Sequence, residues 1–359
     1  MADRAEDPRL VELRNQRKKI YSISKLNTID QCPYQAYLNY IKKEPQKNEN
    51  IYGRLGGKTH DAIELYVHGK AKTEDIKAAI QAELNDLELF GVDFPLSKDG
   101  TPTIRNNWVA NMMKFADNFT FDTSLDTTTE ELILFPIDDD HYLMGYIDAY
   151  VKYEDNMVTL IDWKTSSNFD KAHLLSAGRQ LIVYKMALEK LGYKVQNCCW
   201  CMLKYCETSY MQKNGKIKTK VSEWRNMISD LRSVIEKALV DLGYDPTDIE
   251  CFITEGLEKN SWEPFPKELQ EQFKTSVYYR NYEITPELEA ETLEYIHTNM
   301  DKFETLGDDE VAYSACDISK NSYFCATLCG YGGNSGQCKY YVDYCDKFEE
   351  KKDEFDDLF

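Results

Sequence analysis

The middle of the chain changes from helical to alternating hydrophobic periodicity, and this change constrains the fold most. Residues 141–153, HYLMGYIDAYVKY, alternate apolar and polar side chains, and residues 157–163, MVTLIDW, form a second apolar run. The predicted elements are, in order, strands over 132–137, 141–153 and 157–163, a helix over 170–191 and a strand over 193–210. Strands interleaved with a helix in this order predict an α/β fold built on a mixed sheet.

The regions on either side of this unit are predicted to be mostly helical. Predicted helices cover 8–20, 30–38 with Ser24 or Asn27 as the cap, 59–68, 74–90, 105–119 and 222–242. Gly53, Gly56 and Gly57 are expected to interrupt the chain before helix 59–68. We therefore expect a helical N-terminal region at 1–120, a core at 121–242, an acidic helical region with clustered cysteines at 243–345, and an acidic tail at 346–359.

Charged side chains gather at the ends of the two central strands. Asp148 ends the segment Gly145-Tyr146-Ile147-Asp148, while Asp162 and Lys164 are two residues apart and so share one face of their strand. Two carboxylates suit Mg²⁺ or Mn²⁺, which activates a water for attack on a phosphodiester, and a lysine stabilises the developing charge. A salt bridge on a surface hairpin is the alternative. The apolar runs before each carboxylate favour a site, because a buried carboxylate needs a partner.

Three further side chains fit the same chemistry. Gln180 and Tyr184 are four residues apart and share one face of helix 170–191. His60 ends the segment 56–60 and precedes Glu64 by one helical turn. Each is unremarkable alone, because a single histidine is more often a surface or core residue than a ligand.

The order of these groups resembles the RecB-like branch of the PD-(D/E)XK nucleases, over about residues 21–345. The matching positions are His60, the Gly-x-x-Asp that ends at Asp148, the Asp-x-Lys at 162–164 and the Gln-x-x-x-Tyr at 180–184. The resemblance implies a PD-(D/E)XK core, a mixed sheet flanked by helices, with helical N- and C-terminal regions joined by a metal cluster. It also implies a metal-dependent DNA nuclease.

The resemblance assigns roles residue by residue. The implied metal ligands are His60, Asp148, Asp162 and the backbone carbonyl of Trp163, with Mg²⁺ or Mn²⁺ as the ion. The implied catalytic set is Asp148, Asp162, Lys164, Gln180 and Tyr184. Glu130 or Glu131 is the candidate for the family's upstream acidic residue, and the spacing does not choose between them. Asp162 stands where many members have Glu, a difference that the family pattern permits.

Eleven cysteines point to metal binding or buried thiols, since nothing marks the chain as secreted. The segments around Cys32 and the C-terminal cysteines resemble the iron–sulfur subgroup, which includes AddB-type nuclease subunits and CRISPR-adaptation exonucleases. This resemblance implies a 4Fe–4S cluster on Cys32, Cys325, Cys329 and Cys338, with Cys316 and Cys345 as substitutes. The C-terminal spacing departs from the subgroup's usual pattern. Tetrahedral Zn²⁺ and free thiols are the alternatives.

Cys198, Cys199, Cys201 and Cys206 form a second group within the predicted strand 193–210. Alternation along a strand places them on both faces, so we expect them to be buried small side chains and not ligands of one ion.

The net charge of −19 argues against a protein that coats nucleic acid with its whole surface. Residues 241–310 carry 19 acidic and 5 basic side chains, whereas 1–70 and 201–240 keep a basic excess. This distribution predicts a narrow DNA path beside a repulsive region, with an affinity that falls steeply with salt. The candidate phosphate contacts are Lys213, Lys216, Lys218, Lys220, Arg14, Arg17, Lys18 and Lys19; solvated surface is the alternative.

The acidic peptide 353–359 resembles the partner-docking tails of single-stranded-DNA-binding proteins, and a frayed solubilising end is the alternative. Expected partners are DNA, as single strands or duplex ends, and a helicase, single-strand-binding or recombination protein. No apolar run reaches the length of a membrane span and the chain starts without a signal-peptide pattern. We therefore expect a cytoplasmic protein without a membrane partner.

Two functions remain open from the sequence. The first is a metal-dependent exonuclease acting on DNA ends in recombination, repair or phage DNA processing. The second is a non-catalytic DNA-end-binding or scaffold subunit that keeps the fold and is stabilised by an iron–sulfur cluster or zinc.

Overall fold

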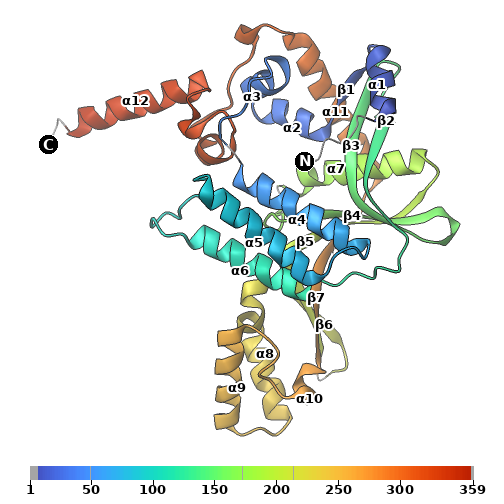
Figure 1. The fold of residues 1–359 in the computed structure, drawn as a ribbon, viewed down its shortest axis with the longest axis vertical. Helices are drawn as coiled ribbons and strands as arrows, with labels where there is room; N and C mark the ends of the chain where they lie inside the picture. The colour runs from blue at the N-terminus through green and yellow to red at the C-terminus, as the bar shows by residue number, and fades with distance from the viewer. Residues whose placement is uncertain (1–6, 49, 172, 213, 357–359) are drawn as a thin grey trace.

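The computed structural model describes residues 7–356 except 49, 172 and 213 (Figure 1). Its centre is one mixed sheet. The strands are β1 (Lys19–Tyr21), β2 (Thr127–Pro136), β3 (His141–Lys152), β4 (Met157–Lys164), β5 (Lys194–Met211), β6 (Ile217–Glu223) and β7 (Phe273–Asn281). Their order is β1-β3-β4-β5-β6, with β2 also pairing with β3 and β7 with β5. The β1–β3 and β4–β5 pairs are parallel and the others antiparallel, which confirms the predicted α/β fold with a mixed sheet.

Helices cover both faces of this sheet. Helices α4 (Ile51–Val67), α5 (Thr73–Leu89) and α6 (Thr103–Asn118) pack on one face, and α2 (Ile23–Gln31), α7 (Leu174–Lys190) and α11 (Pro286–Leu306) on the other. Strand β4 contributes side chains to the hydrophobic core on each face of the sheet, because successive side chains point to opposite faces. Ile161 and Trp163 pack toward α4–α6, whereas Val158 and Leu160 pack toward α7. The same alternation directs Asp162 and Lys164 to the α7 side.

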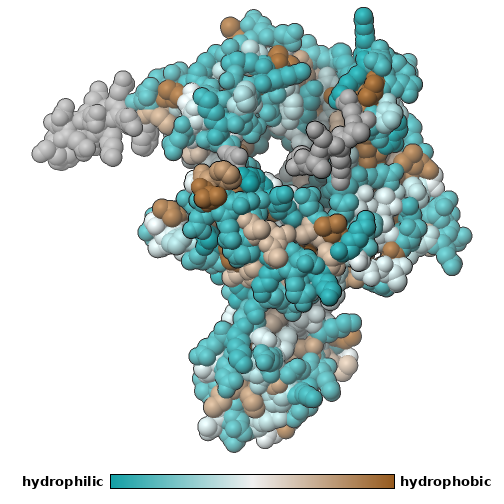
Figure 2. Space-filling view, in the orientation of Figure 1, coloured by the Kyte–Doolittle hydropathy of each residue, from teal (hydrophilic) through white to brown (hydrophobic). Residues whose placement is uncertain are grey.

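The remaining helices lie around this centre. They are α1 (Pro8–Asn15), α3 (Pro33–Ala36), α8 (Met227–Asp241), α9 (Pro246–Lys259), α10 (Lys267–Gln270) and α12 (Lys339–Asp356). Helices α8–α10 and the outer ends of β5–β7 form a lobe at one end of the molecule, and α12 projects from the other end (Figure 1). The surface over α8 and α9 is largely hydrophilic, and an opening is visible between α3 and α4 (Figure 2). None of the described helices is long and apolar enough to cross a membrane.

Two predicted boundaries in the N-terminal third are wrong. Gly53, Gly56 and Gly57 do not interrupt the chain, since they lie inside α4. A Cβ at Gly56 would come within 3.3 Å of Thr165 Oγ1, so the small residue allows the helix to approach the end of β4 closely. The cap of α2 is Ser22, whose Oγ accepts a hydrogen bond from the Lys25 backbone N–H at 3.1 Å, and not Ser24 or Asn27.

The acidic region 243–345, for which the sequence predicted helices and no strand, also contains a strand. Its strand β7 inserts beside β5, because Val277 and the aromatic residues Tyr278 and Tyr279 give 273–281 a strand-forming segment within a strongly charged stretch. The acidic residues therefore do not form one separate body. Helix α9 carries part of them in the outer lobe, and α11 carries another part against α2 and α7.

Smaller differences concern element ends. The predicted helix 8–20 ends at Asn15, and residues 19–21 form β1. The predicted helix 222–242 begins only after β6, which extends to Glu223. The acidic peptide 353–359, which the sequence suggested as a docking tail, lies outside the residues whose side chains are described.

The sheet position of Leu160 gives a stability prediction. Leu160 is fully buried at the centre of β4, so Leu160→Ala is expected to lower the free energy of unfolding by about 2–5 kcal/mol through lost burial and an unfilled cavity. Leu89→Ala is the matched control, because Leu89 is 79% exposed and should change stability by about 0.5 kcal/mol or less. Urea unfolding of both variants measures the difference, and equal costs would contradict the described core.

Candidate active site

The two predicted carboxylates lie where β3 and β4 separate. The last pair of these strands is Ala149 with Ile161, and Asp148 and Asp162 are the next residues on the two strands. Asp148 Oδ2 accepts a hydrogen bond from the Trp163 backbone N–H at 2.8 Å. This bond continues the strand contact through a side chain, so the fold itself sets the spacing of the two acidic residues.

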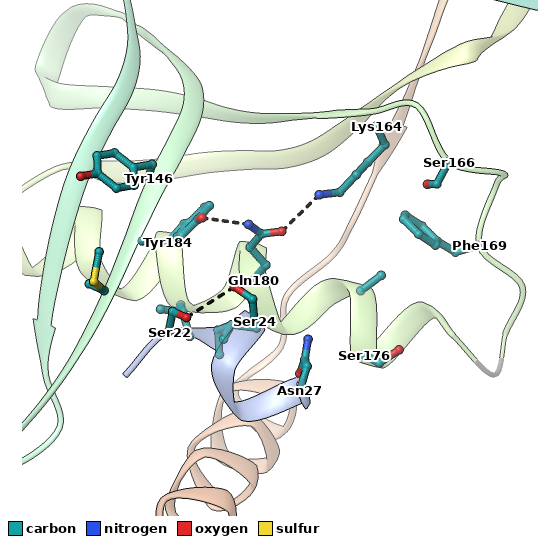
Figure 3. A pocket seen from close by; sticks show the side chains of 15 residues that line it. Ser22, Ser24, Asn27, Tyr146, Lys164, Ser166, Phe169, Ser176, Gln180 and Tyr184 are labelled. Atoms are coloured by element: carbon teal, nitrogen blue, oxygen red, sulfur yellow. Dashed lines mark hydrogen bonds between the residues drawn. The ribbon is translucent and has the colours of Figure 1, made fainter. Parts of the chain in front are cut away.

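Lys164 connects the carboxylates to helix α7. Its Nζ lies 2.7 Å from Asp162 Oδ2 and donates to Gln180 Oε1 at 3.2 Å. Gln180 Nε2 in turn donates to the Tyr184 hydroxyl at 2.8 Å (Figure 3). The structure therefore brings together Asp162, Lys164, Gln180 and Tyr184, as the sequence predicts, in one chain of contacts from β4 to α7.

Gly145 explains how Tyr184 reaches this position. A Cβ at Gly145 would lie 2.6 Å from Tyr184 Cε1, a distance that forbids any larger side chain without movement of the ring. The glycine of the Gly-x-x-Asp segment thus provides space on β3 for the aromatic ring from α7.

His60 lies on α4, across the sheet end from α7. Its Nδ1 is 3.8 Å from Asp148 Oδ2. Burial lowers the pKa of His60 to about 4, although the Asp162 carboxylate and a hydrogen bond with the Trp163 backbone act in the opposite direction. The imidazole is therefore neutral near pH 7, which is the form that binds a metal ion.

Burial shifts the titration of the acidic residues as well. It raises the pKa of Asp148 to about 6 and that of Asp162 to about 6, with Lys164 acting against both shifts. Burial also lowers the pKa of Lys164, but the charges of Asp162 and Asp148 outweigh this effect and the net shift is upward. The lysine is thus held as an ammonium by the carboxylates beside it.

The donor set fits a divalent ion in part. Both oxygens of Asp162 are buried and neither accepts an aligned hydrogen bond; the contact with Lys164 is an ion pair. Such an oxygen is a ready ligand, as are Asp148 and the neutral His60. No group of three or more His, Cys, Asp or Glu side chains among the described residues is already arranged to hold a metal. Mg²⁺ commonly takes one or two carboxylates and completes its shell with water and substrate phosphates.

The structure distinguishes the two candidates for the upstream acidic residue. Glu131 accepts a hydrogen bond from the Tyr150 hydroxyl. The residue pairing between β2 and β3 skips Glu130, which lies between the paired residues Thr129 and Glu131. Glu130 has a left-handed backbone conformation, with φ of 50°. Its charge raises the pKa of Asp148, so Glu130 is the one that lies toward the carboxylates.

The predicted cluster cysteines come together around a second cavity. Cys32, Cys325, Cys329 and Cys338 line it, and Cys316 joins them. Cys316 Sγ lies 3.7 Å from Cys325 Sγ, and its backbone N–H donates to Cys32 Sγ at 3.4 Å. The space between them is about 10 Å³, room for one water-sized body. Cys345 lies on α12 outside this lining.

The other cysteines occupy separate places. Cys198 belongs to the core beside α7, whereas Cys199, Cys201 and Cys206 belong to the opposite core, as expected for a strand. Cys251 is exposed on α9.

The predicted basic segments do not line the cavity beside Lys164. Lys218 and Lys220 are exposed on β6, Lys216 is exposed directly before it, and Lys18 pairs with Asp140 at 3.0 Å. Lys213 lies outside the described residues. The cavity, of about 620 Å³, is instead lined by uncharged groups that sequence reasoning missed, among them Ser22, Ser24, Asn27, Ser166, Phe169 and Ser176 (Figure 3). Single hydroxyls and amides carry no spacing pattern that could have identified them.

The pKa of Asp148 gives a pH prediction. Folding favours the protonated carboxyl, because its pKa rises from 3.8 to about 6, so this residue's contribution to stability is lost as pH rises from about 4 to above 6. Asp148→Asn removes the charge and can still accept from Trp163. In the presence of a chelator, the stability of this variant relative to the wild type should therefore increase over that pH range. Urea unfolding at several pH values measures the gap, and a gap independent of pH would contradict the burial effect.

Comparison with known proteins identifies a family for this chain. The family model described as the PD-(D/E)XK nuclease superfamily matches residues 20–287, which span β1 to the start of α11 and include every residue of the proposed site on β3, β4 and α7. No curated protein matches the chain. With most of its length covered by the family model, the chain belongs to the PD-(D/E)XK nuclease superfamily.

Proposed function

We propose that this protein is a Mg²⁺- or Mn²⁺-dependent deoxyribonuclease that acts as an exonuclease on DNA ends. The observation that carries the proposal is the buried Asp162 carboxylate, whose oxygens accept no hydrogen bond and which is paired with Lys164 at 2.7 Å. Burying a carboxylate in this way destabilises the fold unless a cation compensates it. A buried, charged side chain of this kind is typical of a catalytic site.

The chain's own residues have distinct tasks in this reaction. When bound, a divalent ion would provide an activated water and polarise the phosphodiester. Asp162, Asp148 and the neutral imidazole of His60 would hold it, together with the Trp163 carbonyl. Lys164 stabilises negative charge that develops on the phosphate. Gln180 and Tyr184 keep the lysine extended toward the substrate, since they form the hydrogen-bonded chain that ends at its Nζ.

The order of the site residues along the chain supports the RecB-like branch and a role in recombination, repair or phage DNA processing. Residues 1–359 hold no G-x-x-x-x-G-K-[ST] segment, and an ATP-driven helicase is among the partners that we propose. The location that we propose is cytoplasmic, where DNA and a helicase, single-strand-binding or recombination partner meet.

The central test of the proposal is DNA cleavage. With Mn²⁺, the wild type should degrade end-labelled DNA, and Asp162→Ala or Lys164→Ala should lower the rate by at least about a hundredfold. Asp86→Ala and Lys237→Ala make the same changes at exposed helix positions and should retain full activity. Products that shorten stepwise from the labelled end would identify an exonuclease.

Metal binding provides a readout independent of cleavage. Mn²⁺ should raise the melting temperature of the wild type but not of Asp162→Ala, because only a folded site binds the ion. A wild type that cuts no DNA and melts at the same temperature with and without Mn²⁺ would contradict the proposal and favour the scaffold alternative.

We also infer that the cysteine cavity binds a metal centre, a 4Fe–4S cluster on Cys32, Cys325, Cys329 and Cys338. Four or five thiols from opposite ends of the chain converge there, a grouping that buried structural cysteines do not require. The cavity of about 10 Å³ must widen to hold a cluster, whereas a single Zn²⁺ needs less space.

Metal analysis of anaerobically purified protein separates these possibilities. A cluster predicts iron with an equal amount of acid-labile sulfide, and both should be lost in Cys32→Ala. Cys251→Ala, at an exposed cysteine, should keep them. Zinc without sulfide would show that the cavity holds a zinc ion and not a cluster. Absence of any metal would contradict both proposals.

A further inference from the structure

The cavity beside Lys164 has walls that are polar but almost uncharged. It is bounded by α2, β3, α7 and the loop after β4 (Figure 3). Lys164 is the one charged side chain among the described residues that line it, and its ammonium is already paired with Asp162. Ser24 and Asn27 of α2 face Gln180 of α7 across this space (Figure 3). A phosphate chain that passes through would therefore meet mainly hydroxyl and amide groups.

Asn27 has its amide held in one orientation. The Tyr295 hydroxyl, on α11, donates to Asn27 Oδ1 at 2.8 Å. The other end of the amide, Nδ2, points toward the cavity (Figure 3) and makes no hydrogen bond with another described residue. An amide fixed through its oxygen thus presents two N–H donors to whatever occupies the cavity.

Helix α2 is anchored to α11. Besides the bond from Tyr295 to Asn27, Lys302 Nζ lies 3.1 Å from Asp30 Oδ1, and the Tyr295 ring is itself held by the Arg179 guanidinium of α7, 3.6 Å from its centre. Cys32, directly after α2, belongs to the cysteine cavity. These contacts hold α2 in place, so its side chains can bind a ligand without first changing position.

We propose that α2 is the wall that holds the substrate strand, with Asn27 Nδ2 donating to a phosphate of one unpaired DNA strand and Tyr295 positioning Asn27. The proposal rests on the nuclease function and assigns strand contacts within the same site. Ser, Asn and Gln side chains supply many of the phosphate contacts in protein–DNA complexes. The volume of about 620 Å³ is that of a pocket for one small molecule, and it encloses a nucleotide or two of a single strand, not a duplex.

Uncharged contacts have a consequence for salt. Only phosphates that are neutralised by cations release counterions, so a strand in this groove should lose about tenfold or less in affinity between roughly 50 and 200 mM salt. The uneven charge of the sequence predicted a steep fall. For DNA strands short enough to lie within the groove, the uncharged lining predicts a shallow salt dependence of the affinity instead.

The decisive variant is Asn27→Asp, which keeps the acceptor for Tyr295 and replaces the donor by a carboxylate. Asn197→Asp is the matched control, because it adds the same charge at a surface amide that bonds Asn281 Oδ1 at 3.0 Å outside the groove. Fluorescence anisotropy with a labelled single strand of about six nucleotides, with a chelator present, measures the affinity. We expect at least about a tenfold loss for Asn27→Asp and less than about twofold for Asn197→Asp.

A second variant separates positioning from contact. Tyr295→Phe frees the Asn27 amide and should weaken binding by less than Asn27→Asp does. With Mn²⁺ it should raise KM more than it lowers kcat, whereas Tyr244→Phe, which removes a hydroxyl contact with Glu268 in the outer lobe, should change neither.

The outcomes are distinct from those of the cleavage test. Equal affinities of Asn27→Asp and Asn197→Asp, a steep salt dependence, or tighter binding of the matching duplex would overturn the role of α2. The binding measurement decides this even if the wild type cuts no DNA, a result that would contradict the nuclease function alone.

Discussion

The ion pair between Asp162 and Lys164 is the interaction on which the site depends. Both residues lie at the end of a strand whose preceding side chains are committed to two hydrophobic cores, so neither can move away without disturbing the sheet. A carboxylate in this position is costly, and the lysine compensates part of the cost while burial still raises the pKa of Asp162 to about 6. The remaining contacts of the site, through Gln180 to Tyr184 and through Asp148 to Trp163, fix the geometry around this pair.

The two faces of the sheet contribute different parts of the site. Helix α4 brings His60 from one face, and α7 brings Gln180 and Tyr184 from the other. Helix α2 links this region to the cysteine cavity, since its first turns line the groove and Cys32 follows its last residue. The groove and the cysteine cavity are therefore joined by one short helix.

The central elements were predictable because their signals are local. Alternation in β3 and β4 and the i, i+4 spacing on α7 fixed the faces on which Asp148, Asp162, Lys164, Gln180 and Tyr184 lie. Other features depend on tertiary contacts. Gly56 lies inside α4, where a Cβ would come within 3.3 Å of Thr165 Oγ1, and the residue pairing between β2 and β3 skips Glu130 but includes Glu131. The convergence of Cys316 with Cys32 and the role of Asn27 rest on contacts between residues far apart in the chain.

The claim that the buried carboxylates form a divalent-ion site is tested most directly by calorimetric titration of Mn²⁺ at pH 6 and pH 8. Because the pKa values of Asp148 and Asp162 are about 6, binding at pH 6 must displace protons, and buffers of different ionisation enthalpy reveal this release. We expect one Mn²⁺ per chain with proton release at pH 6 and almost none at pH 8. Absence of binding, or equal binding by Asp162→Asn, would contradict the account.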